Sequence, residues 1–277
     1  MPEVAIVGAG PVGASIAHRL AERGRTGAIL LVDGTGQVAA GKALDIRQSG
    51  PVQRFDTPVD AATDVLAAAA APVIVIADES QGGSWDGERG LALVRQLLRA
   101  GSRSTLVFAC PSQTGLMEAC YRELHVAADR LVGTAASAVV SAVRGVTALE
   151  LGLAAVDLVV AGRPPKFVIG WSGAAVGGSP LAQEVPAHRL LAISAALGKL
   201  WPSGPYAIAS STAPIIEALL AGSRQRHHAL TVLDGELDAR GSAVLLPLTL
   251  GRGKVLAHTI PALSAQERTE LITGIGR

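Results

Sequence analysis

The sequence predicts an α/β fold in which a doubly wound parallel sheet is followed by a part of mixed α+β structure. Strand-like apolar runs alternate with helical patterns through the first half of the 277-residue chain. These runs are continuously apolar, which is typical of parallel strands covered by helices on both faces. After about residue 130 the alternation gives way to hairpin-like strands, which favour antiparallel pairing. We therefore expect two tightly packed domains, residues 1–130 and 131–277.

The elements of the first half follow from apolar periodicity. Predicted strands and helices alternate as EVAIVGAG, PVGASIAHRLAERG, AILLVDG, QVAAGKALDIRQS, PVIVIAD, ERGLALVRQLLRAG and STLVFACP. In the last of these helices Leu91, Val94 and Leu98 share one face, while Arg95 and Arg99 point away from it. That pattern is typical of a helix docked on a sheet.

The second half begins with a predicted helix at about 134–151. Strands are expected at about 157–162 and 166–171, followed by two helices. The chain then forms a meander that includes HHALTVLDG, SAVLLPLTLG and GKVLAHTI. We expect its histidines, His227, His228 and His258, to be exposed.

Composition restricts the classes of partner. Lys and Arg number 24 against 23 acidic residues, the net charge is +1 and aromatic residues make up 3% of the chain. We therefore expect neither nucleic acid nor a membrane surface as a partner. The chain enters a strand at once, without room for a secretion signal, so we expect a cytoplasmic protein. Its two cysteines have no metal-ligand spacing, and no metal site is predicted.

A glycine-rich turn between the first strand and the first helix carries the sharpest functional signal. It reads Gly8-Ala9-Gly10-Pro11-Val12-Gly13. Such glycines permit a tight turn, approach of a diphosphate to the backbone and close helix packing, and Pro11 is tolerated in a first helical turn. The helix N-terminus would then hold the diphosphate. Asp33 ends the second strand, where a carboxylate accepts hydrogen bonds from the adenosine ribose.

These residues predict a dinucleotide site, and the carboxylate of Asp33 favours NAD over NADP. We expect Gly8, Gly10, Pro11, Val12, Gly13, Asp33 and Ala77 to contact the cofactor. The alternative is a turn of the same shape that keeps its glycines for packing and binds no nucleotide.

Further segments carry a resemblance to a known family. GAGPVGASIAHRL, LLVDGTGQVAAGKALDIRQSGPV, GWSGAAVGGSPL, GPYAIASSTAPIIEALL, LTVLDGE and LPLTLGRGKV occur in this order. They resemble the lactate and malate dehydrogenase family over nearly the whole chain. The resemblance implies an NAD-binding Rossmann domain, a mixed α/β catalytic domain and a homodimer or homotetramer. It also implies reduction of a 2-keto acid by NADH, with a histidine proton donor and an arginine that grips the substrate carboxylate.

The catalytic side chains of that family are missing from the matching positions. Arg163 stands where the histidine is expected, in the bend GRPPK. Val139 and Ala142 replace the orienting aspartate and the substrate-binding arginine, and Cys110 replaces an asparagine before proline. An arginine stays protonated and cannot shuttle a proton at neutral pH. Efficient turnover of malate or lactate is therefore not expected.

Two functions remain open. In the first, the protein is an NAD-dependent oxidoreductase acting on another small molecule, with Arg163 stabilising an oxyanion and Lys166 or Cys110 handling the proton. In the second, it is a catalytically inactive relative that binds NAD or serves as an oligomeric scaffold. For Arg163 and Lys166 a solvated turn is the structural alternative, and for Cys110 it is core packing.

Overall fold

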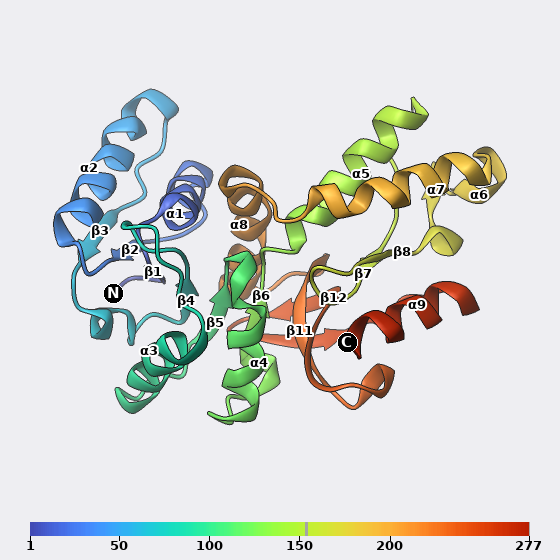
Figure 1. Ribbon diagram of the computed structural model, residues 1–277. Coiled ribbons are helices and arrows are strands. Elements are labelled where there is room, and N and C mark those ends of the chain that lie inside the picture. Colours follow the sequence, from blue (N-terminus) through green and yellow to red (C-terminus); the bar gives the residue numbers. More distant parts are fainter. Residues whose placement is uncertain (153–154, 277) are drawn as a thin grey trace.

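The computed structural model describes residues 1–152 and 155–276 and contains one large mixed sheet (Figure 1). Its nine strands run in the order β13-β12-β11-β6-β5-β4-β1-β2-β3. They are β1 Val4–Val7, β2 Ile29–Val32, β3 Val59–Ala62, β4 Val73–Ile76, β5 Thr105–Phe108, β6 Leu131–Gly133, β11 Arg226–Asp234, β12 Arg240–Gly251 and β13 Lys254–His258. The first six are parallel, and β11 joins them by pairing antiparallel with β6.

Helices cover both faces of this sheet. They are α1 Pro11–Arg23, α2 Gly36–Gln53, α3 Gly87–Arg99, α4 Thr114–Arg122, α5 Ser137–Leu151, α6 Leu181–Glu184, α7 Ala187–Ala196, α8 Pro205–Ala221 and α9 Ala265–Ile275. Short 3-10 turns and two small strand pairs complete the described chain. The pairs are β7 Val160–Ala161 with β8 Val168–Ile169, and β9 Ala175–Val176 with β10 Ser179–Pro180.

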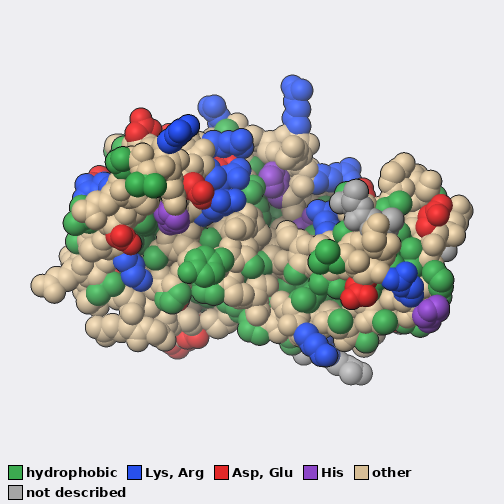
Figure 2. All heavy atoms as spheres, turned by 90° about the horizontal axis from the view of Figure 1, so that it is seen from above, with side chains coloured by type: hydrophobic (Ala, Val, Ile, Leu, Met, Phe, Trp, Pro, Cys, Tyr) green, Lys and Arg blue, Asp and Glu red, His purple; other side chains and the backbone are tan. Residues whose placement is uncertain are grey.

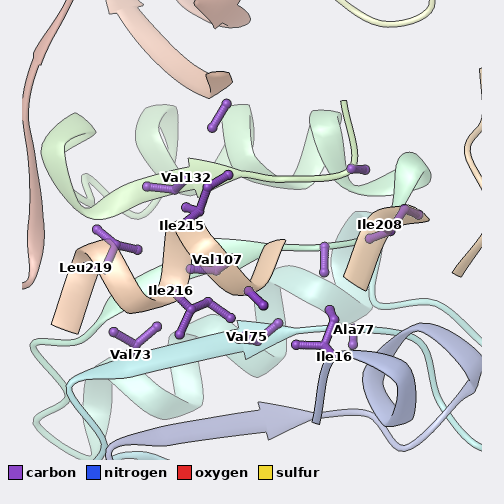
Figure 3. Packing of buried hydrophobic residues seen from close by; sticks show 14 of the residues in the cluster. Ile16, Val73, Val75, Ala77, Val107, Val132, Ile208, Ile215, Ile216 and Leu219 are labelled. Carbon is purple, nitrogen blue, oxygen red and sulfur yellow. The ribbon is translucent and has the colours of Figure 1, made fainter. Parts of the chain in front are cut away.

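The core forms because the central strands are apolar on both faces. Every residue of β1, β4 and β5 is buried, and β1 pairs in parallel register with β2 and β4. Figure 3 shows α8 lying across these strands, with Ile216 between Val73 and Val75 and Ile215 beside Val132. Side chains on the other face meet α3 and α4, which lie below the sheet in Figure 1.

The structure confirms the predicted fold class and corrects its details. The antiparallel meander does not form a separate sheet, because β11 continues the parallel one. The strands expected at 157–162 and 166–171 shrink to two residues each, on either side of the proline bend. The predicted boundary at residue 130 falls directly before β6, the last parallel strand. The predicted second domain, 131–277, includes residues 153, 154 and 277, which lie outside the described residues.

The elements that were not predicted include β3, β6, α4 and α9. β3 and β6 are short, and β3 is an edge strand that carries Asp60. α9 does have a sequence signal, since Ser264 and Glu267 form a capping box at its start. No helix in the described residues has the length and apolar character needed to cross a bilayer.

Candidate functional site

The glycine turn has the predicted strand-turn-helix geometry. β1 ends at Val7, and Pro11 occupies the first turn of α1. Gly8 has a φ of 110°, and a Cβ there would lie 2.3 Å from the carbonyl oxygen of Asp78. A Cβ at Gly13 would lie 2.0 Å from the carbonyl oxygen of Gly8. Neither position can therefore hold a larger residue without moving the backbone.

The side chain of Asp78, which follows β4, lies against the N-terminus of α1. Its carboxylate accepts hydrogen bonds from the Val12 amide, at 3.0 and 3.1 Å, and from the Gly13 amide at 3.0 Å. Its carbonyl oxygen accepts from the Gly10 amide at 2.8 Å. Free amides and the helix dipole favour an anion at this point, and here the protein's own side chain supplies that anion. A Cβ at Gly10 would lie 2.4 Å from the Asp78 carboxyl carbon.

Sequence reasoning missed Asp78, although a signal was present. The residue follows directly after the alanine that ends the buried run of β4, and β4 lies beside β1. Carboxyl ends of parallel strands meet at one edge of a sheet, so an acid at this place faces the turn after β1. Ala77, expected at the cofactor, is fully buried beneath the turn, with its amide bonded to the Val7 carbonyl.

The Asp33 carboxylate is also engaged by the protein itself. One oxygen accepts from the Ala9 and Ser80 amides, at 2.8 and 2.9 Å. The other accepts from the Thr35 amide at 2.9 Å and the Ser80 hydroxyl at 2.8 Å. A carboxylate offers about four acceptor positions, and all four are taken. The residue is 6% exposed, so neither the surface nor the lone pairs needed for ribose hydroxyls remain.

These four bonds make Asp33 a determinant of stability. Burial alone would raise the pKa of Asp33, but the hydrogen bonds from Ala9, Thr35 and Ser80 bring it below its ordinary value. Asp33→Asn should therefore lower the free energy of unfolding by about 1–2 kcal/mol at pH 7. Because the folded pKa is depressed, this contribution exists above the unfolded pKa of about 4 and disappears as pH falls through the folded value. Urea unfolding at pH 7 and pH 3 measures it.

The exposed Asp60 on β3 supplies the control for that experiment. Asp60→Asn should change the unfolding free energy by less than about 0.5 kcal/mol. If the two variants were equally stable at pH 7, the bonding assigned to Asp33 would be wrong.

The residues at the turn do not fit a bound dinucleotide. The diphosphate would have to displace the Asp78 carboxylate from the Val12 and Gly13 amides, and the two negative charges repel each other. The ribose would have to displace Ser80 from Asp33. Lys42, on α2, also reaches the turn, where its ammonium donates to the Ala9 carbonyl.

Arg163, which is half-buried, forms an ion pair with a buried glutamate. Its Nε and Nη2 donate to Glu118 of α4 at 2.8 and 3.0 Å, and Glu118 is 4% exposed. The Ala243 amide donates to the same carboxylate at 3.0 Å. The hydrogen bonds that Arg163 donates to Glu118 raise the pKa of Arg163 above its ordinary value. Arg163 thus links the proline bend to Glu118 on α4, and Glu118 in turn is bonded to Ala243 on β12.

The surroundings of Cys110 and Lys166 differ from those of Arg163. Burial, with a smaller contribution from the Asp78 charge, raises the pKa of Cys110 to about 12. A thiol of this kind stays protonated at neutral pH and is a poor nucleophile. Lys166 is exposed, and its side chain passes Gly274 of α9. The side chains of Arg163, Cys110 and Lys166 therefore have different surroundings and do not form one catalytic group.

The two positions on α5 where catalytic side chains were expected hold no ionisable group. Val139 is fully buried in the apolar core and Ala142 is half-buried. The nearest charged residue on this helix, Arg144, donates to the Leu158 carbonyl at 2.9 Å. Sequence reasoning did not single out Glu118, and this residue determines the position and the partner of the Arg163 side chain.

The sequence is similar to those of bacterial malate dehydrogenases. The chain is 30% identical to the malate dehydrogenase of Thermomicrobium roseum, over 97% of this chain and 93% of that protein. It is 28% identical to a malate dehydrogenase of Dehalococcoides mccartyi strain BAV1, over 98% and 95%. Models of protein families gave no match.

Solved structures show the same fold. The minor L-lactate dehydrogenase of Enterococcus mundtii superposes with a TM-score of 0.86 at 20% identity, over 99% of this chain and 95% of that chain. The malate dehydrogenase of Salinibacter ruber superposes with a TM-score of 0.85 at 24% identity, over 99% and 94%. Together with the identity to the Thermomicrobium protein, this agreement shows that the chain belongs to the lactate/malate dehydrogenase family of oxidoreductases.

Proposed function

We propose that this protein is a non-catalytic member of its family that keeps the fold and uses no dinucleotide. The observation that carries the proposal is the Asp78 carboxylate on the amides of Val12 and Gly13. An internal carboxylate at a helix N-terminus supplies the charge that a phosphate would otherwise bring. The protein would then act through its surface, as a binding or assembly module.

The glycines of the turn are explained without a ligand. Asp78 itself excludes a side chain at Gly8 and Gly10, and the Gly8 carbonyl excludes one at Gly13. The pattern that predicts a cofactor is therefore also the pattern that seats Asp78. This removes the main sequence argument for NAD and supports the alternative in which the glycines serve packing.

The catalytic positions support the same proposal. A general acid contributes about a hundred- to ten-thousand-fold in rate, and substrate orientation contributes more. Arg163 is paired with Glu118, Cys110 is a buried thiol of very high pKa, and Val139 is apolar. No side chain at these positions can exchange a proton at neutral pH.

A second function rests on the partial exposure of Asp78. Rotation of this side chain toward solvent would free the Val12 and Gly13 amides. The protein would then be an NAD-dependent oxidoreductase acting on a small molecule other than malate or lactate.

Titration with NADH and NAD separates the two functions. We expect no saturable binding up to about 1 mM and no oxidation of NADH with oxaloacetate, pyruvate, aldehydes or imines above the rate without protein. Turnover of any of these substrates would establish the oxidoreductase instead. Saturable NADH binding without turnover would contradict the claim that the turn is closed.

We further propose that the protein assembles with copies of itself into a homodimer or homotetramer. Leu44 on α2 and Tyr206 on α8 are 47% and 83% exposed, and apolar side chains of this kind favour association. Light scattering coupled to size-exclusion chromatography should give a mass at least twice 28.1 kDa. A mass of one chain at micromolar concentration would reject this assembly.

A further inference from the structure

A groove of about 510 Å³ lies between α3 and η1, the 3-10 turn Val65–Ala68. The described residues that line this α3 groove are Leu66, Ala92, Arg95, Gln96, Arg99 and Ala100. None of these six is acidic, and Leu66 is 42% exposed. Asp64 precedes η1, and its carboxylate accepts a hydrogen bond from the Leu66 amide at 2.9 Å. The groove thus combines exposed apolar surface with two guanidinium groups.

The two arginines of the groove are not neutralised by the protein. Arg95 and Arg99 lie one turn apart on α3, so their Cβ atoms are about 5–6 Å from each other, and like charges at this spacing destabilise a helix. Within residues 1–152 and 155–276 neither side chain forms an ion pair. Arg89, on the same helix, is paired with Glu79 at 2.6 Å. The contrast indicates that the partner of Arg95 and Arg99 comes from outside the chain.

Two further arginines continue the positive charge beyond α3. Arg103 is exposed and stands four residues after the last residue of the helix. Arg130 donates to the carbonyls of Ser102 and Ser104, at 3.4 and 2.9 Å, which holds it beside the segment that carries Arg103. Burial lowers the pKa of Arg130, and the charge of Arg103 lowers it further, against the opposing charge of Asp129. The cations therefore extend from the groove to the place where β5 begins.

The histidines of the meander do not add to this charge. The structure corrects their expected exposure, because His227, His228 and His258 are all half-buried. His258 is paired with Glu236 at 3.2 Å. Burial and then the charge of Arg144 lower the pKa of His228 to about 4, so its ring is neutral at pH 7. The positive charge of the α3 groove is therefore that of its arginines.

The α3 groove lies on the face of the sheet opposite to α2 and α8 (Figure 1). Figure 2 looks down on that other face and shows hydrophobic side chains exposed near its middle. Self-assembly through Leu44 and Tyr206 would cover that face. The α3 groove would remain open in such an assembly and is available to a different partner.

From the two unneutralised arginines and the exposed Leu66 beside them, we propose that the α3 groove binds an acidic, extended segment of another protein. A carboxylate matches the planar guanidinium group with two parallel hydrogen bonds. Side chains on one side of an extended segment recur about every 6–7 Å, close to the spacing of Arg95 and Arg99. An aliphatic side chain next to the acids would cover Leu66.

A nucleic acid fits the groove less well. No aromatic side chain lines it among the described residues, so bases have nothing to stack on. The chain as a whole carries 24 cationic against 23 acidic residues, which gives no net field that attracts a polyphosphate. The groove shares no residue with the glycine turn or with Arg163. The proposal therefore goes beyond the proposed function, and NADH binding by the protein would leave it standing.

Fluorescence anisotropy with a short labelled peptide tests the proposal at low ionic strength. The peptide alternates glutamate with alanine and carries one leucine at its centre, and it should bind the unaltered protein saturably. Arg95→Gln and Arg99→Gln should each weaken binding about threefold, and the double variant at least about tenfold. Leu66→Ala, which changes no charge, should weaken binding about twofold or more. Arg268→Gln, exposed on α9, is the matched control and should leave the affinity unchanged.

Two further probes define the partner. The same peptide with glutamine in place of glutamate should not bind. Single-stranded oligothymidylate should bind more weakly than the acidic peptide. Tighter binding of the oligonucleotide, lost in the Arg95→Gln/Arg99→Gln variant, would make the partner a nucleic acid and reject an acidic protein segment.

Two results with the acidic peptide would overturn the site itself. The first is an absence of saturable binding, or an affinity that the Arg95→Gln/Arg99→Gln variant retains, since the peptide would then bind elsewhere or not at all. The second is an affinity that Leu66→Ala leaves unchanged, because the contact would then be one of charge alone, outside the groove.

Discussion

Arg163→Met should lower the free energy of unfolding by about 3–5 kcal/mol. The substitution leaves the Glu118 carboxylate buried, with the Ala243 amide at 3.0 Å and the exposed Arg122 at 4.0 Å as its remaining partners. Taking a charge out of water without its counterion is costly, so the loss exceeds the strength of the ion pair itself. Chemical denaturation at pH 7 measures the difference.

Two further variants show whether this loss comes from the pair. Glu118→Gln combined with Arg163→Met removes both charges and keeps an oxygen for the Ala243 amide, so it should cost less than Arg163→Met alone. Arg252→Gln, which changes an exposed side chain in the turn between β12 and β13, should change stability by less than about 0.5 kcal/mol. If Arg163→Met behaved like Arg252→Gln, Arg163 would be free to serve a substrate, and its structural role would be rejected.

Asp78→Ala should convert the turn into a nucleotide site, with NADH binding at least about tenfold tighter than any binding by the unaltered protein. The change frees the Val12 and Gly13 amides and removes the charge that repels a diphosphate. The same change should cost about 2 kcal/mol of stability, because the helix loses its N-terminal anion. Fluorescence titration and urea unfolding measure the two effects on one preparation.

Asp56→Ala is the control for this variant, because Asp56 is exposed and lies outside the turn. It should alter neither NADH affinity nor stability. Asp78→Ala would lose stability without gaining NADH affinity only if the hydrogen bonds from Ser80 to Asp33 still excluded the ribose. In that case the double variant Asp78→Ala/Ser80→Ala should bind NADH. Equal NADH affinity for the unaltered protein and for Asp78→Ala would show that Asp78 does not block the turn.

Local sequence pattern predicted most of the first half of the fold. Buried parallel strands are continuous apolar runs, so β1, β4 and β5 could be found from the residues alone. The glycine turn was also placed correctly between β1 and α1. β3 was missed because an edge strand with a polar residue lacks the periodic signal of a buried one.

The candidate site was predicted less well, because long-range partners determine what each residue does. Asp33 lies where a ribose-binding acid is expected, but Ser80, 47 residues later, takes its lone pairs. The sequence alone predicts a free cation at Arg163, since nothing local indicates that Glu118, 45 residues earlier, lies within hydrogen-bonding distance. A glycine motif likewise shows that something must approach the backbone closely, without showing whether it is a ligand or Asp78.

The decisive measurement is a crystal structure of the unaltered protein grown with saturating NAD. Our account predicts the Asp78 carboxylate on the Val12 and Gly13 amides, Ser80 still bonded to Asp33, and no ordered nucleotide in the crevice. A diphosphate on those amides, with Asp78 turned toward solvent, would contradict it and restore the oxidoreductase as the function of this chain.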